Sequence, residues 1–289
     1  MPTSDVDIAG GYDERVRVSL RLPPLFWLAV GWIGVILALA LFANLLAVPS
    51  PTDMDMLEKR MPPSAAQWLG TDNLGRDMLA RLIYGARISL TVGIASPLIG
   101  LIVGGALGML AGYLRGRLET IIVASVDVLL AFPPLVLALA LTAYLGQTVA
   151  NLTYIIGILS IPAFTRVARA STLSIANREF VLAARALGAT EARILAREVL
   201  PNVILPLVAF FLLAVAVTIV VEGALSFLGL GVPPPAPSWG GMIGEGRESL
   251  EIAPRIAFLP AGTMFLSVLA FNIVGDTLRA LTDPRQAAL

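Results

Sequence analysis

The chain has 289 residues, of which 57% are hydrophobic and 14% are charged, and its net charge at pH 7 is zero. A mean hydropathy of +0.85 lies outside the range of soluble globular domains and predicts a protein of the lipid bilayer. Because the sequence contains neither His nor Cys, a Ser-His-Asp triad, a His-based zinc site, a histidine proton relay, disulfides and iron–sulfur clusters are excluded.

Six stretches are long and apolar enough to cross a bilayer, which takes about 20 residues of helix. They are residues 24–48, 88–114, about 120–145, about 151–171, 202–230 and 256–275. The first could also be a signal peptide, but its apolar core exceeds the usual ~7–15 residues and no clear cleavage site follows. The pattern predicts an all-α membrane protein with six transmembrane helices.

The division between the third and fourth spans rests on the turn residues Gly146, Gln147 and Thr148, with Asn151 close behind. Within the third span, Pro133-Pro134 predicts a kink, which serves either packing or gating.

The segments between the spans suggest the domain organisation. Residues 1–23 form a tail, 24–48 the first transmembrane helix, 49–87 an extracytoplasmic segment, and 88–289 a five-helix core with a polar loop at 172–200. In 49–87 we expect a cap at 70–72 followed by an amphipathic helix that holds Arg76, Arg81 and Arg87 near lipid headgroups. Residues 233–241 are too rich in Pro and Gly for a helix, and we expect an outer loop with Trp239 at the interface.

Six crossings place both termini on one side of the membrane, and basic residues favour the cytoplasmic side. Thirteen arginines fall in the terminal segments and the loops of that side, against seven basic residues in the opposite segments. The seven are Lys59, Arg60, Arg76, Arg81, Arg87, Arg247 and Arg255. The count predicts that both termini, and the polar loop between spans four and five, face the cytoplasm.

The polar loop at 172–200 lies in a polar stretch that runs from Arg166 to Glu198. From Glu179 onward its residues favour a helix, and Phe180, Ala184 and Leu187 recur at helical spacing to form one apolar face. Gly188 suits a left-handed helix stop.

A second short helix follows the stop. Thr190 can cap it, and Glu191 in its first turn complements the helix dipole. We expect it to carry Ile194 and to end before Pro201, because proline disfavours helical geometry in the preceding residue. Composition alone favours a solvated connector with helical content over a functional element.

Three carboxylates fall within or at the ends of spans: Asp127, Glu222 and Asp276. An ionised carboxylate at the bilayer centre costs at least ~2.5 kcal/mol, so such groups usually face protein or water. We expect them in structural ion pairs, for instance with Arg169 or Arg279, rather than in contact with a solute.

Two further patterns concern partners. The small residues Gly100, Gly104, Gly108 and Gly112 recur at helix-packing intervals and predict a close interface, within this chain or with a partner. The only lysine is Lys59, so no glycine-rich phosphate loop ending in Gly-Lys-Ser/Thr exists, and ATP would have to be bound by another subunit.

Several motifs together resemble one family. Ala183-Ala-Arg-Ala-Leu-Gly188 followed by Leu200-Pro-Asn202 is similar to the cytoplasmic loop of ABC-importer permeases, in which a short coupling helix seats on an ATPase subunit. Four more blocks resemble dipeptide and oligopeptide permeases of the DppC/OppC type: Leu69–Asp77 with Gly85–Leu90, Asp127–Pro134, Glu222–Gly231, and Asn272–Arg279 with Asp283–Arg285. The blocks extend from residue 69 to the C-terminus.

The sequence departs from the loop motif at two positions. Leu182 stands where the family has glutamate, and Glu198 stands where the family has isoleucine. Glu179, which lies on the same helix face as Leu182, is our candidate for the missing carboxylate.

The resemblance implies a type I ABC importer permease in the cytoplasmic membrane of a bacterium, with no catalytic or metal site of its own. It implies a second homologous permease, two ATPase subunits that bind ATP and Mg²⁺, and an extracytoplasmic solute-binding protein. It implies that the ATPase-coupling residues are Glu179, Phe180, Ala183, Ala184, Arg185, Leu187, Gly188, Arg193 and Pro201.

The resemblance further implies that the solute is a short peptide, with nickel or another small solute as the alternative within the family. An ion-coupled secondary transporter is the alternative from another class, and would require Asp127 or Glu222 for transport. A membrane enzyme would need a serine or carboxylate site that no pattern in the sequence supplies.

Overall fold

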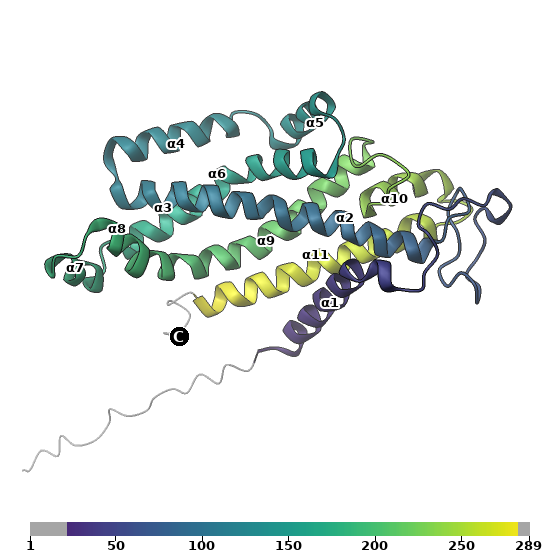
Figure 1. Cartoon of the computed structure of the whole chain (residues 1–289), viewed down its shortest axis with the longest axis horizontal. Coiled ribbons are helices and arrows are strands. Elements are labelled where there is room, and N and C mark those ends of the chain that lie inside the picture. Colours follow the sequence, from purple (N-terminus) through teal and green to yellow (C-terminus); the bar gives the residue numbers. More distant parts are fainter. Residues whose placement is uncertain (1–21, 283–289) are drawn as a thin grey trace, which may run out of the picture.

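The computed structural model describes residues 22–282, and the regular structure in that range is helical, with one isolated β-bridge between Thr71 and Asp77. The longer helices lie side by side along the long dimension of the molecule (Figure 1). The helices are α1 (Pro24–Leu41), α2 (Met78–Ile99), α3 (Gly105–Leu114), α4 (Gly116–Leu130), α5 (Pro134–Leu145), α6 (Val149–Ile175), α7 (Glu179–Ala186), α8 (Glu191–Ile194), α9 (Leu200–Phe227), α10 (Trp239–Gly246) and α11 (Arg255–Thr282). Residues 1–21 and 283–289, including the Asp283-Pro284-Arg285 block and four of the arginines counted for orientation, lie outside the described range.

The predicted six spans are present when one bent pair counts as a single crossing. Five helical stretches are long and apolar enough to span a membrane: Pro24–Leu41, Met78–Leu114, Val149–Ile175, Glu191–Phe227 and Arg255–Leu281. Helices α4 and α5, bent by 76° at the break between them, make the sixth. The protein is therefore an all-α membrane protein.

The break in the third span lies at the predicted prolines. Pro133 precedes α5 in an extended conformation, and Pro134 is the first residue of that helix. A proline disfavours helical geometry in the residue before it and is well suited to start a helix, so the pair ends α4 and begins α5.

The second span begins ten residues earlier than expected. Asp77 caps α2 by accepting a hydrogen bond of 2.7 Å from the Ala80 N–H, and the helix starts at Met78. The prediction of a separate amphipathic helix in 49–87 was wrong, because Arg81 and Arg87 belong to the first turns of α2. Arg87 is exposed, but Arg81 is buried.

Arg81 is buried because a network of opposite charges surrounds it. The carboxylate of Asp72 contacts Arg76 Nε at 2.6 Å and Arg81 Nε at 3.2 Å. Glu245 in α10 contacts the same two guanidinium groups at 2.6 and 2.9 Å. The four charges sum to zero, which offsets the penalty of removing them from water.

The expectation of an irregular loop at 233–241 was also wrong in part, since α10 begins at Trp239. Ser238 caps this helix by accepting a hydrogen bond of 3.1 Å from the Gly241 N–H. Trp239 is buried rather than interfacial, and its indole N–H donates to the Leu82 carbonyl at 3.1 Å. Packing against α2 therefore overrides the low helix propensity of this segment.

The glycine stripe predicted as an interface packs within this chain, where α3 and the π-helical turn Gly100–Gly104 before it meet α6. A Cβ atom at Gly104 would lie 2.5 Å from the Ile161 carbonyl oxygen, and one at Gly108 would lie 2.2 Å from that of Thr165. Only glycine allows the two helix backbones to approach so closely.

The bundle has two distinct ends. Helices α7 and α8 lie at the end where α11 finishes, on the left of Figure 1, and α10 lies at the opposite end. We call these the loop end and the cap end.

Candidate functional site

The most distinctive feature of the loop end is the bend between α7 and α8. Gly188 adopts φ +81°, the left-handed conformation expected of a helix stop. Thr190 then caps α8 by accepting a hydrogen bond of 3.4 Å from the Arg193 N–H. The local sequence therefore specifies a short helix, a sharp bend and a second helix start.

The second short helix does not end before Pro201, contrary to our expectation. Residues Leu195–Val199 form a π-helical turn that leads directly into α9, so one helical stretch extends from Glu191 to Phe227. A proline inside a regular α-helix loses a hydrogen bond and clashes with the carbonyl four residues earlier. The wider turn immediately before α9 relieves that constraint, and the loop is continuous with the fifth span.

The loop is held to the bundle by apolar side chains. Val181 of α7, Ile194 of α8 and Val199 are fully buried and pack with Phe164 of α6 and Val203 of α9. These contacts join the loop to both helices that flank it in the chain.

The predicted apolar face of α7 is split between the interior and the surface. Ala184 is half-buried against the core, whereas Phe180 is 41% exposed and Leu187 is 87% exposed. The helix instead buries Val181, so Phe180 and Leu187 are available to contact another protein.

The remaining predicted coupling residues lie on the same end of the molecule. Glu179, Ala183, Arg193 and Pro201 are exposed. Arg185 contacts Glu191 across the bend at 3.1 Å, and the hydrogen bonds to that carboxylate raise the pKa of Arg185 above its ordinary value.

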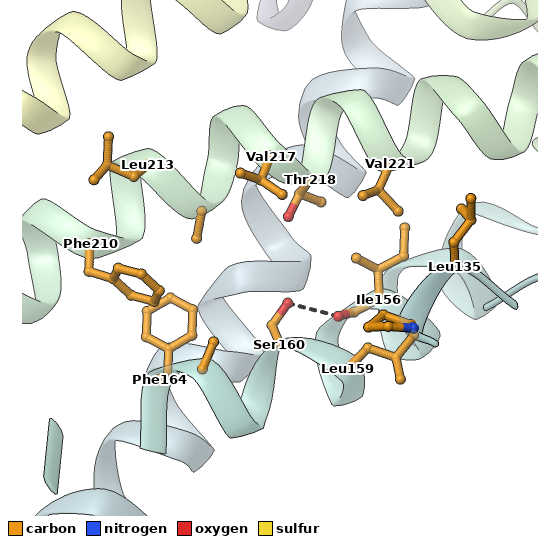
Figure 2. A pocket seen from close by; sticks show the side chains of 13 residues that line it. Leu135, Ile156, Leu159, Ser160, Phe164, Phe210, Leu213, Val217, Thr218 and Val221 are labelled. Atoms are coloured by element: carbon orange, nitrogen blue, oxygen red, sulfur yellow. Dashed lines mark hydrogen bonds between the residues drawn. The ribbon is translucent and has the colours of Figure 1, made fainter. Parts of the chain in front are cut away.

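A cavity of about 270 Å³ lies between the two helices that flank the loop. Its walls come from α6, α9 and the start of α5, and Figure 2 shows Phe164 and Phe210 facing each other at one end of it and Leu135 at the other. The lining is apolar except for Ser160 and Thr218. The Ser160 hydroxyl already has a hydrogen-bond partner, since it donates to the Ile156 carbonyl at 2.8 Å.

The connection between cavity and loop is direct. Phe164 lies eleven residues before the end of α6, and Phe210 ten residues after the start of α9. At 1.5 Å per residue, a continuous helix of roughly 16 Å or less joins each of these two phenylalanines to the loop. The loop is therefore close in the chain to both walls of the cavity.

The charged pairs of the loop end differ from those expected. Asp127 of α4 contacts Arg166 of α6 at 2.7 Å, whereas Arg169 binds Glu119. Asp276 is exposed near the end of α11. The ion pairs fasten the half-span α4 to α6.

Glu222 has hydroxyl partners instead of the expected cation. Its two carboxylate oxygens accept hydrogen bonds from Ser89 of α2 at 2.9 Å and from Ser226 of α9 at 2.7 Å. Ser226 in turn contacts Ser238, the cap of α10. The carboxylate thus joins three helices at the cap end.

Several residues of the site were not foreseen from the sequence. Val181 and Ile194 carry a signal that could have been used, since they are apolar side chains in an otherwise polar loop. Tyr113 of α3, which contacts Arg185 and Glu191, carries none, because 72 residues separate it from Arg185. Within residues 22–282, no group of three or more acidic side chains is placed to hold a metal ion.

Comparisons with known proteins agree with this geometry. The family model described as "binding-protein-dependent transport system inner membrane component" matches residues 104–288. The chain is 45% identical over 223 residues to the glutathione transport system permease protein GsiD of Pectobacterium atrosepticum, an alignment that covers 77% of this chain and 74% of that protein. The identity to the protein of the same name from Escherichia coli O6:K15:H31 is 42%, with the same coverage.

Among solved structures, a chain of the inward-facing MetNI methionine ABC transporter superposes with a TM-score of 0.58 at 18% identity, covering 71% of this chain and 98% of that one. At this identity the likeness concerns the fold alone.

Proposed function

The chain belongs to the family of binding-protein-dependent transport system inner membrane components, and from that premise we propose that it forms one membrane-spanning half of an ATP-driven importer of short peptides. It is a transport subunit rather than an enzyme. The structural observation that supports the proposal best is the loop α7–α8, which is exposed at its tip, continuous with α9 and joined to α6 by a short turn, these being the two main helices that line the cavity.

The proposed assembly contains four other subunits of three kinds. A second homologous permease completes the pathway, two ATP-binding subunits hydrolyse ATP with Mg²⁺, and an extracytoplasmic protein delivers the solute. The need for separate ATPases is supported by the sequence, in which the single lysine stands outside any phosphate-binding loop.

In the proposed orientation the loop end faces the cytoplasm and the cap end faces outward. The excess of basic residues favours this orientation. Two of the basic residues at the cap end, Arg76 and Arg81, are paired internally with Asp72 and Glu245 and present no uncompensated charge. Three arginines on the loop-end side, Arg166, Arg169 and Arg185, are likewise paired with carboxylates, so the pairing leaves the sign of the asymmetry unchanged.

The mechanism follows from these connections. When ATP draws the two ATPases together, they displace α7 through the exposed side chains of Phe180 and Leu187. Because α8 continues into α9, the displacement passes into the fifth span without a flexible joint. The walls of the cavity then move relative to each other, and the pathway opens alternately to either side.

The proposed solute is a short peptide, because two relatives with more than 40% identity are named as glutathione permeases and glutathione is a tripeptide. The cavity is too apolar to select a charged ion by itself. We place the choice of solute mainly in the binding protein.

The test is reconstitution in proteoliposomes with the second permease, the ATPases and the binding protein. We expect uptake of glutathione or other short peptides that requires ATP and persists when ionophores remove ion gradients. ATP-dependent uptake of nickel without uptake of peptides would contradict the proposed solute class. Uptake driven by an ion gradient without ATPases would contradict the proposed mechanism.

A further inference from the structure

Three side chains meet at the loop end from three different helices. Tyr113 comes from the last turn of α3, Arg185 from the last turn of α7, and Glu191 is the first residue of α8. Arg185 donates to Glu191 through Nε and through a terminal nitrogen, both at 3.1 Å. The same terminal nitrogen donates to the Tyr113 hydroxyl at 3.1 Å, and that hydroxyl donates to Glu191.

The geometry of this cluster is well defined. Both oxygens of Glu191 are engaged by one guanidinium group, which fixes the orientation of the pair. The guanidinium carbon also lies 6.0 Å from the centre of the Tyr113 ring, within the range of a cation–π contact. Each member therefore has two partners within the cluster.

Stability alone does not account for the cluster. Arg185 and Glu191 are about half exposed, and exposed ion pairs contribute little to folding. The apolar contacts of Val181 and Ile194 already hold the loop to α6 and α9. What the cluster adds is a connection to a different helix, α3.

A second contact strengthens the same connection. Arg115, the residue after α3, donates to the side chain of Asn177 in the turn between α6 and α7 at 3.3 Å. The inner end of the second span is thus attached to the loop on both sides of α7.

The second span reaches the opposite end of the molecule. Helices α2 and α3 form one helical stretch from Met78 to Leu114, which is roughly 55 Å long at 1.5 Å per residue. At the cap end this stretch carries Arg81, bound to Glu245 of α10, and Ser89, bound to Glu222. A displacement applied at Tyr113 is therefore delivered to α10.

We propose that Tyr113, Arg185 and Glu191 are positioning residues that fasten the loop α7–α8 to the second span, so that movement of the loop reaches the cap end through α2–α3 as well as through α9. This inference rests on the proposed function, because it requires the loop to be displaced by an ATPase.

The test measures solute imported per ATP hydrolysed in the reconstituted transporter. Tyr113→Phe removes one hydroxyl and retains the ring. We expect unchanged association with the ATPases and a decrease in the import ratio of about 2- to 10-fold, the range for a lost hydrogen bond. The matched control is Tyr144→Phe on α5, whose side chain is 86% exposed and makes no hydrogen bond within the described residues.

The outcomes separate this inference from the proposed function. An import ratio for Tyr113→Phe equal to that of the wild type overturns the inference. If the wild-type chain neither associates with ATPases nor imports solute with ATP, the proposed function itself fails.

A rescue experiment distinguishes positioning from simple structural support. The chain contains no cysteine, so Tyr113→Cys together with Glu191→Cys provides a unique thiol pair when the partner subunits are cysteine-free. We expect a low import ratio for the free thiols and recovery when a short bifunctional reagent bridges them. A bridged protein whose ratio stays low or falls further would show that the two positions must separate during transport, which contradicts the inference.

Discussion

The Ser89 hydroxyl of α2 donates a hydrogen bond of 2.9 Å to the Glu222 carboxylate of α9, joining the second and fifth spans by a polar contact that is buried from both sides. Together with Ser226 and Ser238, the pair connects α2, α9 and the cap of α10. The contact explains why a carboxylate is present in an otherwise apolar helix without a basic partner.

Glu222→Leu is expected to destabilise the protein. The substitution leaves the hydroxyls of Ser89 and Ser226 without their acceptor, which costs about 1–3 kcal/mol for a buried polar group. Thermal unfolding of the purified subunit in detergent measures the change. Glu222→Gln retains an acceptor and is expected to unfold near the wild-type temperature.

Glu222→Gln also distinguishes an importer from an ion-coupled carrier. In the importer, Glu222→Gln is expected to retain ATP-driven uptake in proteoliposomes, because the residue holds helices together and carries no ion. Abolished uptake in a Glu222→Gln protein of normal thermal stability would favour the carrier instead.

Arg81→Met is expected to have a much larger effect than the same change at Arg87. Arg81 is 1% exposed and contacts Asp72 and Glu245, so its removal leaves the buried Asp72 carboxylate and the partly exposed Glu245 carboxylate with Arg76 alone, at a cost of about 3–5 kcal/mol. Arg87 lies on the same helix but is exposed, and its replacement should change stability by less than about 0.5 kcal/mol. Equal unfolding temperatures for the two variants would contradict the network.

Two glycine-to-alanine substitutions are expected to affect the free energy of unfolding differently, one lowering it and the other leaving it unchanged or raising it. At Gly108 an added methyl group would lie 2.2 Å from the Thr165 carbonyl oxygen, so Gly108→Ala forces α3 away from α6 and destabilises by about 1–3 kcal/mol. A Cβ added at Gly34 of α1 would meet no neighbouring side chain or other helix within 4 Å, and Gly34→Ala should be neutral or stabilise by up to about 1 kcal/mol. Measuring both by thermal unfolding tests whether the stripe packs inside this subunit.

Gly188 should be sensitive to backbone preference rather than to size. No atom lies within 4 Å of a Cβ placed there, but φ is +81°, a conformation that costs most residues about 1–2 kcal/mol. We expect Gly188→Val to reduce ATP-driven uptake by altering the bend, and Gly188→Asn to reduce it less, since asparagine tolerates this conformation. Uptake at the wild-type level by both variants would show that transport does not depend on the bend.

The features that the sequence predicted are those encoded locally. Runs of apolar residues indicate the spans, Pro133-Pro134 marks the break in the third, and Gly188 with Thr190 specifies the bend in the loop. The glycine stripe indicates a close helix contact, although its spacing does not identify α6 as the neighbour.

The features that were missed depend on distant partners. Arg81 can enter the second span only because Glu245 lies beside it, and 164 residues separate the two. Trp239 is buried at the start of α10 because α2 supplies a backbone acceptor for its indole N–H. The π-helical turn before Pro201 likewise depends on how α8 and α9 pack, and no residue type marks it.

Cross-linking from position 187 measures most directly whether α7 meets an ATP-hydrolysing subunit. Leu187 is 87% exposed at the tip of the loop, and Leu187→Cys would be the only thiol in the chain. In the assembled transporter we predict that a photoreactive reagent on this thiol attaches to an ATPase subunit, with a yield that changes when ATP is added. A thiol that reacts only with impermeant reagents applied from outside the cell, and never joins an ATPase, would contradict the account.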